Sequence, residues 1–253
     1  MKTWKLTVEY DGTKYSGWQE QNNARTVAGS LRSAFEDFLQ SPIELMGAGR
    51  TDAGVHALGQ VAHVKLHKSD RRHPRYEPAF LQKQVNDRLP SDISVLQVEE
   101  EAPHFHARHD ATARSYLYQI ATRKTAFHKR HVWWLKEELD IEAMQQAAAR
   151  FPGRHNFARF AQKDPSKPHE STIVHVESAE VFTDDFLILF RVEASHFLWR
   201  MVRRLVGVTV KVGLGEVTLD ELDALLNNKG DARLDVAAWT APAAGLFLES
   251  VRY

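Results

Sequence analysis

Segments with the two-residue period of a strand and segments with the helical period of about 3.6 residues follow one another along the chain, and this order occurs twice. Strands are expected at residues 4–10, 43–46, 60–66, 93–98, 115–122, 172–182, 186–194 and 246–251. Helices are expected at residues 27–38, 78–89, 141–151, 198–212 and 217–226. This mixture predicts an α+β fold with mixed, mainly antiparallel sheets.

Capping residues and turns mark several of the expected boundaries. Thr26 precedes one helical segment and Thr218 lies at the start of another, and both are suitable N-caps. The polar turn Thr183-Asp184-Asp185 separates two strand segments and therefore predicts a hairpin. The two sets of elements predict an N-terminal α/β subdomain at residues 1–106 and a C-terminal α/β subdomain at residues 107–253.

The chain contains no cysteine, which excludes disulfides, iron–sulfur clusters, thiolate zinc sites and cysteine nucleophiles. No apolar run approaches the roughly 18 residues that a membrane span needs, and the N-terminal residues lack the apolar core of a signal peptide. We therefore expect a cytoplasmic protein without membrane contact.

Positive charge is clustered although 33 basic residues balance 33 acidic ones. One cluster lies at residues 65–75, and a second lies at residues 123–131 and precedes Trp133-Trp134. Clustered cations favour binding to nucleic acid, but a solvated loop explains each run equally well. The two tryptophans are suited to stacking on RNA, to a protein interface or to a core.

A loop rich in glycine and alanine, residues 47–57, contains Arg50, Asp52 and His56. Glycine permits close approach of another molecule, and a nearby arginine favours the ionised form of a carboxylate. A dinucleotide-binding loop would need glycine at position 52, and a P-loop would need a following Gly-Lys-Ser/Thr, so neither fits. From the residues alone, a surface turn with a salt bridge remains the alternative to a catalytic carboxylate.

The segment 49–57, followed by Gly59-Gln60-Val61, resembles the signature of TruA-type tRNA pseudouridine synthases, the pseudouridine synthase I family. Further matching blocks follow the family's order over the whole chain, at residues 9–21, 105–118, 156–160, 197–207 and 241–253. The resemblance implies the pseudouridine synthase fold, in which two α/β subdomains share a mixed, mainly antiparallel sheet with a central active-site cleft.

The resemblance also implies roles for individual residues. Asp52 matches the catalytic aspartate, and Arg203 matches the basic residue that pairs with it. Arg50 matches the residue that helps to open the base stack, and Tyr116 matches the tyrosine that packs on the uracil. His56, Arg108 and Arg114 belong to matched blocks and are expected to bind substrate.

The residues themselves leave two of these roles open. Arg203 lies off the apolar stripe of its expected helix, which suits a cleft but also an exposed helix arginine. Tyr116 alternates with Tyr118 along one strand, and core packing would explain both. His56, His63 and His67 flank an expected strand at spacings that do not converge on a metal ion.

The implied function is isomerisation of uridine to pseudouridine at positions 38, 39 and/or 40 of the tRNA anticodon stem-loop, with base flipping and without cofactor or metal. The implied partners are tRNA and a second copy of the chain. A non-catalytic RNA-binding or tRNA-folding module is the main alternative. A small-molecule glycosidase or lyase is a third, although most glycosidases need a second carboxylate.

Two features depart from the family pattern. Val174 follows Thr172-Ile173 where the family often has arginine, and the stretch 67–79 is long and polar. Neither departure affects the residues expected to carry the chemistry.

Overall fold

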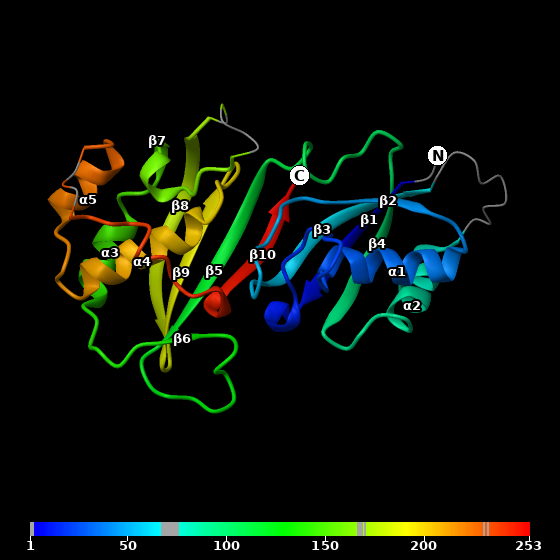
Figure 1. Ribbon diagram of the computed structural model, residues 1–253, viewed down its shortest axis with the longest axis horizontal. Coiled ribbons are helices and arrows are strands. Elements are labelled where there is room, and N and C mark those ends of the chain that lie inside the picture. Colours follow the sequence, from blue (N-terminus) through cyan, green and yellow to red (C-terminus); the bar gives the residue numbers. More distant parts are fainter. Residues whose placement is uncertain (1–2, 67–75, 166–168, 170, 230, 232) are drawn as a thin grey trace. The chain divides into compact units, whose positions relative to one another are not determined.

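The computed structural model describes residues 3–66, 76–165, 169, 171–229, 231 and 233–253 (Figure 1). These residues form two compact units: unit 1 is Met1–Thr112 with Phe247–Tyr253, and unit 2 is Ala113–Leu246. Each unit combines a mainly antiparallel sheet with helices, which confirms the predicted α+β fold. The chain leaves unit 1 at Thr112, a few residues beyond the expected boundary at residue 106, and returns to it at Phe247.

Unit 1 is built around the antiparallel pair β1 (Thr3–Tyr10) and β3 (His56–Leu66), with β4 (Ile93–Glu101) antiparallel on the other side of β1. The second edge of β3 is shared by two strands. β2 (Ile43–Gly47) pairs antiparallel with its residues 62–66, and β10 (Leu246–Arg252) pairs in parallel with its first two residues. The start of β3 is therefore fixed on both sides.

The core of unit 1 follows from the two periodicities in the sequence. Strand β1 buries every second side chain, namely Trp4, Leu6, Val8 and Tyr10. Helix α1 (Val27–Leu39) buries an apolar stripe, and its N-cap is the expected Thr26, whose side chain accepts a hydrogen bond from the backbone of Gly29. Helix α2 (Pro78–Asn86) begins at a proline, as the first turn of a helix permits.

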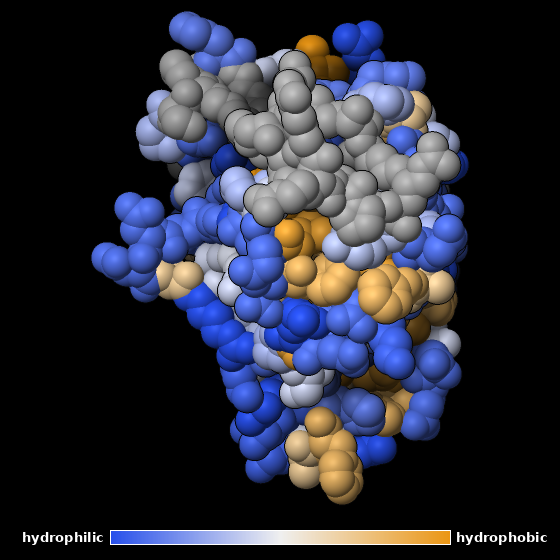
Figure 2. Space-filling model, turned by 90° about the vertical axis from the view of Figure 1, so that its right-hand side faces the viewer, coloured by the Kyte–Doolittle hydropathy of each residue, from blue (hydrophilic) through white to orange (hydrophobic). Residues whose placement is uncertain are grey.

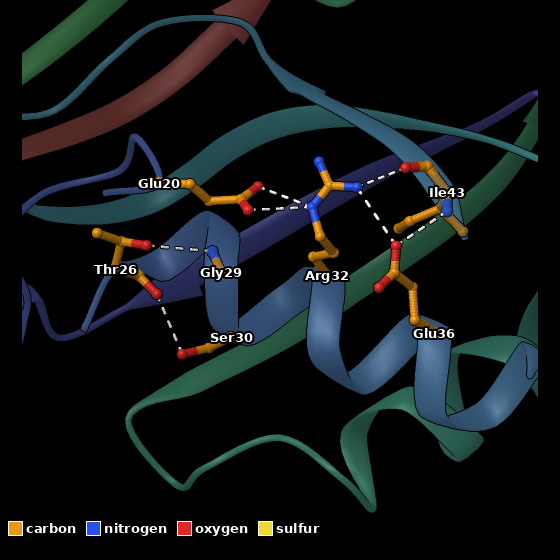
Figure 3. Close-up of polar contacts among 7 residues, drawn as sticks. All are labelled: Glu20, Thr26, Gly29, Ser30, Arg32, Glu36 and Ile43. Atoms are coloured by element: carbon orange, nitrogen blue, oxygen red, sulfur yellow. Dashed lines mark hydrogen bonds and ion pairs between the residues drawn. The ribbon is translucent and has the colours of Figure 1, made fainter. Parts of the chain in front are cut away.

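Arg32 connects α1 to the start of β2 (Figure 3). Its Nε donates to both carboxylate oxygens of Glu20, at 2.9 and 3.1 Å, and its terminal nitrogen contacts Glu36 and the carbonyl oxygen of Ile43. Glu36 in turn accepts the backbone N–H of Ile43 at 3.0 Å. The helix is thus fixed to the strand that leads into the loop at residues 48–55.

An aromatic cluster joins α1 to α2. Phe38, Tyr76 and Phe80 have ring centroids 5.1 to 6.1 Å apart, and the guanidinium of Arg88 lies 5.3 Å from the centroid of Phe38. Phe80 is half exposed. Figure 2 shows this side of unit 1, where hydrophobic side chains gather among hydrophilic ones.

Unit 2 contains an antiparallel sheet in the order β5 (Ala113–Ala121), β9 (Leu187–Ala194), β8 (Ile173–Asp184), β7 (Gly153–Asn156). The two-residue strand β6 (Trp133–Trp134) pairs in parallel with the end of β5. Strands β8 and β9 form the predicted hairpin, whose turn places Asp185 in the left-handed region at φ 50°.

Three helices complete unit 2: α3 (Ile141–Ala148), α4 (Met201–Gly213) and α5 (Leu219–Leu226). Helix α4 is buried along nearly its whole length, and α5 begins with the expected cap Thr218, which forms a capping box with Glu221. Short 3₁₀ turns lie at η2 (Ala158–Phe160) and η3 (Ala243–Gly245) in unit 2, and at η1 (Gly12–Lys14) in unit 1.

The structure corrects three details of the sequence prediction. Strands β6 and β7 were not expected, and β3 begins at His56, so the loop before it is shorter than predicted. Helix α4 begins at Met201 rather than at residue 198, because Arg200 adopts a left-handed conformation at φ 61°. Most of the polar stretch 67–79, and most of the basic run 65–75, lie outside the described residues.

Among the described residues, no helix combines the length and the apolar character that crossing a membrane requires.

Candidate functional site

The loop between β2 and β3, residues 48–55, contains one acidic residue, Asp52. Asp52 is half-buried and Arg50 is exposed. The backbone of the loop is fixed at its start: the N–H of Ala48 donates to the carbonyl oxygen of Val61 at 2.7 Å, and the side chain of Gln60 donates to the carbonyl oxygen of Gly49 at 3.0 Å. The loop therefore has a defined conformation around a carboxylate that solvent reaches.

A second segment of unit 1, residues 11–18, lies against this loop. The backbone N–H of Trp18 donates to the carbonyl oxygen of Thr51 at 3.1 Å, and the N–H of Gly54 donates to that of Tyr15 at 3.3 Å. These two bonds attach the loop to the segment on either side of Asp52. The position of the carboxylate is thus set by Tyr15 and Trp18, which come much earlier in the chain.

The two segments approach so closely that one contact requires glycine. A Cβ atom at Gly12 would lie 1.9 Å from the carbonyl oxygen of Val55, far inside van der Waals distance. The N–H of Gly12 also lies 3.0 Å from Nδ1 of His56, and Oδ1 of Asp11 lies 3.1 Å from the same nitrogen. Residue 12 is therefore in contact with both the end of the loop and the start of β3.

His56 is 1% exposed and stacks on Phe247 of β10, with ring centroids 4.8 Å apart. The sequence suggested a substrate contact, and the structure buries the side chain against the last strand of unit 1. Its contacts fix the loop to the last strand of the unit.

A buried hydroxyl pair supports the residue before Asp52. The hydroxyl of Tyr10 and the Oγ1 of Thr51 lie 2.9 Å apart, and the two side chains are 4% and 6% exposed. Burial raises the pKa of Tyr10 to about 12, although hydrogen bonds to Thr51 and Gln60 oppose the shift. The tyrosine is consequently neutral at physiological pH and keeps a proton for this hydrogen bond.

Within the segment 11–18, Tyr15 is held in place by contacts of its hydroxyl and of its ring. Its hydroxyl donates to the carboxylate of Asp92 and accepts from Arg25 at 2.8 Å, while the guanidinium lies 4.5 Å from the centroid of its ring. Burial, together with the carboxylate, raises the pKa of Tyr15 to about 12. Sequence reasoning found Tyr10 and Tyr15 only as matched motif positions, and no signal identified Arg25 or Asp92.

Arg108 lies in a turn, and the backbone of the residue before it, Ala107, forms two hydrogen bonds. Ala107 donates its N–H to Nδ1 of His63 at 3.0 Å, and its carbonyl oxygen accepts from the hydroxyl of Tyr253 at 2.7 Å. Arg108 itself is exposed. Unit 1 therefore contains Asp52, Arg50, His56 and Arg108 of the predicted residues.

Unit 2 contains the other three. Tyr116 lies on β5, is 8% exposed and meets Phe197 edge to face with ring centroids 5.1 Å apart. Arg114, two residues earlier on the same strand, is 9% exposed and donates to the carbonyl oxygen of Ser195 at 2.8 Å. The 195–197 segment after β9 therefore supports both side chains.

Arg203 lies in the first turn of α4 and is half-buried. Its Nε donates to the carbonyl oxygen of Ala241 at 2.6 Å, and the backbone of Ala241 donates to the carbonyl oxygen of Arg203 at 3.0 Å. One turn later, a Cβ at Gly207 would lie 1.8 Å from the carbonyl oxygen of Trp239. The 239–241 segment thus fixes both the backbone and the guanidinium of Arg203.

The chain matches the sequence model of a family described as tRNA pseudouridine synthase, over residues 6–110 and 147–253. It is 38% identical over 258 residues to the tRNA pseudouridine synthase A of Brucella ovis, which covers the whole of this chain and 98% of that protein. It is 34% identical over 256 residues to the tRNA pseudouridine synthase A 2 of Bacillus cereus, over the full length of both. The family segments include Asp52 and Arg203, while Tyr116 lies between them.

Proposed function

Since the chain belongs to the tRNA pseudouridine synthase family and is thus an isomerase of tRNA uridine, we propose that it forms pseudouridine at positions 38, 39 and/or 40 of the anticodon stem-loop. The observation that carries the proposal is the half-buried Asp52, the single carboxylate of a loop whose backbone is fixed on both sides of it. A binding module for a polyanion has no use for a fixed carboxylate at its surface.

Uridine and pseudouridine have the same atoms, so the reaction needs no oxidant, reductant or second substrate. The bond between N1 of the uracil and C1′ of the ribose breaks, the base turns, and C5 bonds to C1′. C5 then loses its proton and N1 gains one. Asp52 is the proposed catalytic residue, because cleavage and reattachment both require a negatively charged group held against the flipped nucleotide.

Arg203 is proposed as the second catalytic residue, supplying the positive charge that the family resemblance pairs with the aspartate. Its hydrogen bond to Ala241 supports this role because it fixes the guanidinium before substrate binds. A fixed charge needs no reorganisation during the reaction.

The remaining residues are proposed to bind the substrate. Arg50 is exposed beside Asp52, where a planar guanidinium suits the space that a flipped base leaves. Tyr116 offers an aromatic platform for the uracil, and Arg108 offers a cation to the RNA backbone. Arg114 and His56 are more deeply buried, so their proposed part in substrate binding is to hold the groups around them.

We further propose that the protein acts in the cytoplasm as a homodimer on tRNA. Equal numbers of basic and acidic residues give no net attraction to RNA. Two copies that engage one tRNA would combine two modest basic surfaces, which supports the dimer.

The test is single-turnover formation of pseudouridine on an unmodified tRNA transcript, comparing wild type with Asp52→Asn while RNA binding is measured in parallel. We expect the rate to fall by a factor of about 10² to 10⁴, with RNA binding retained. The exposed Asp87 of the same unit provides the matched control, Asp87→Asn, which should keep full activity.

Full activity in Asp52→Asn would contradict the catalytic assignment. A wild type that binds tRNA without modifying it would support the non-catalytic binding module instead. Transcripts with a single uridine at position 38, 39 or 40 then identify the modified position.

A further inference from the structure

The loop that connects β5 to β6, residues 122–132, carries a concentration of positive charge that the proposed chemistry does not use. Residues 122–136 contain five cations, Arg123, Lys124, Lys129, Arg130 and Lys136, and no acidic residue. The four cations within the loop are all exposed. The loop is the green segment below β6 in Figure 1.

Phe127 lies between these cations and is 92% exposed, the highest value among the exposed large hydrophobic residues of the described chain. An aromatic ring in this position contributes nothing to the core of unit 2. Leaving it in water is unfavourable unless a partner covers it. The residue is therefore better explained by a contact outside the chain than by packing within it.

The base of the loop is ordered by hydrogen bonds, which fixes where Phe127 is presented. Thr122 donates to the carbonyl oxygen of Phe186 through both its backbone N–H and its hydroxyl, at 2.9 and 3.0 Å. The N–H of His131 donates to the carbonyl oxygen of His128 at 2.8 Å, and the following Val132 is buried. The first residue of the loop is thus attached next to β9, and its last residues form a turn that leads into β6, which pairs with β5.

Aromatic rings and cations alternate around the base of the loop. The guanidinium of Arg123 lies 3.9 Å from the centroid of Phe186, and the ammonium groups of Lys124 and Lys136 lie 6.0 and 5.6 Å from that of Trp134. Trp134 is itself 38% exposed. Cations spread over aromatic faces form a surface that suits a polymer with both phosphates and bases.

We propose that residues 122–132 form an RNA-binding surface in which the cations contact phosphates and Phe127 stacks on an unpaired base of the tRNA other than the modified uridine. The proposal rests on the proposed function, because it takes tRNA as the substrate. Stacking on an aromatic side chain and neutralisation of phosphates by Lys and Arg are the two general means of holding single-stranded RNA.

Charge favours RNA over a second copy of the chain as the occupant. A protein partner would need an acidic surface opposite five cations. Glu137 and Glu138 directly follow Lys136, and Asp184 and Asp185 lie in the hairpin turn next to Phe186, but residues 122–136 themselves carry only positive charge. The repeating phosphates of RNA match the cations without a further partner.

The experiment measures tRNA binding and single-turnover pseudouridine formation for Phe127→Ala and for the double variant Lys124→Ala/Lys129→Ala. For Phe127→Ala we expect about tenfold weaker binding and an unchanged rate at saturating enzyme, with Phe127→Tyr close to wild type because it keeps the ring. For the double variant, the slope of log affinity against log salt should fall by roughly 1.5. Lys163→Ala/Lys229→Ala, which removes two exposed cations elsewhere in unit 2, should leave both quantities unchanged.

Affinity at the wild-type level in both loop variants, with the wild type active, would overturn the inference and leave the proposed function intact. A change of oligomeric state by light scattering in Phe127→Ala would also overturn it, because the loop would then contact a second copy. A wild type that binds tRNA without modifying it would refute the proposed function alone, since the effect of the loop is read from binding. A wild type that does not bind tRNA would refute both.

Discussion

The hydroxyl of Tyr10, at the end of β1, lies 2.9 Å from Oγ1 of Thr51, the residue before the proposed catalytic aspartate. Both groups are buried, so neither has water as an alternative partner. Tyr10→Phe removes one hydroxyl and leaves the other unsatisfied, which should cost about 1–3 kcal/mol. We expect kcat to fall with KM little changed, because the altered group positions Asp52 rather than binding RNA.

Urea denaturation and steady-state kinetics on a tRNA transcript would measure these two effects. Thr51→Ser keeps the hydroxyl and should retain most activity, whereas Thr51→Val keeps the shape and should resemble Tyr10→Phe. Equal kinetics for the serine and valine variants would show that the hydrogen bond has no part in positioning the loop.

Gly12→Ala should disrupt the same region by a steric route. The added methyl group would lie 1.9 Å from the carbonyl oxygen of Val55, and a backbone atom cannot rotate away as a side chain can. We expect a loss of about 1–3 kcal/mol in the free energy of unfolding and a large loss of activity. The matched control is Gly49→Ala, because a Cβ at Gly49 meets nothing within 4 Å. Should both alanine variants unfold at the same urea concentration, the close contact at residue 12 has no energetic weight.

The stability of unit 1 should depend on pH through His63. Its side chain is fully buried, Nδ1 accepts the N–H of Ala107 at 3.0 Å, and Nε2 lies 3.3 Å from Glu44. Burial lowers the pKa of His63 from 6.5, against the opposing effect of Glu44. At pH values between the folded-state and unfolded-state pKa of His63, the unfolded state binds more protons than the folded state. The contribution of His63 to the free energy of unfolding is therefore constant above about pH 6.5 and falls as the pH drops below it.

Urea denaturation at several pH values between 5 and 8 would measure this dependence. In His63→Asn the amide oxygen can still accept from Ala107, and the decline in stability at acidic pH should be smaller. It should not vanish, because burial also lowers the pKa of His106. The same decline in wild type and His63→Asn would exclude His63 as the titrating group.

Arg203→Lys separates the charge of this residue from its geometry. Lysine keeps the positive charge but lacks the Nε–H that donates to Ala241 at 2.6 Å. We expect the single-turnover rate to fall by about 10² or more, with tRNA affinity retained. The neighbouring Arg200 is exposed, so Arg200→Lys should be close to wild type. Full activity in Arg203→Lys would mean that the charge alone is sufficient.

The sequence predicted the elements that depend on local interactions. Helix α1 starts after Thr26 because the cap and the apolar stripe lie within a few residues of each other, and the β8–β9 hairpin follows from its polar turn. Strands β6 and β7 escaped prediction because two and four residues are too short to show alternation. The left-handed Arg200 that shortens α4 has no local signal either.

The site residues were predicted by motif resemblance, which also matched Tyr10, Gly12 and Tyr15 but gave no indication of what these residues contact. The contact of Gly12 with Val55 and the contact of Tyr15 with Asp92 join parts of the chain that are far apart in sequence. Such pairs are fixed by the tertiary fold, so neither periodicity nor composition could reveal them. His56 is likewise buried by packing against Phe247, a residue of the strand at the other end of the sequence.

The pairing of β10 with the start of β3 has a consequence for synthesis on the ribosome. Residues 247–253 leave the exit tunnel after the whole of unit 2, which can close its own sheet earlier. Until then unit 1 lacks the strand that covers His56 and the start of β3. A nascent chain therefore completes the support of Asp52, the proposed catalytic residue, only after its other unit has been made, and a chain that terminates before residue 247 has unit 1 without this strand.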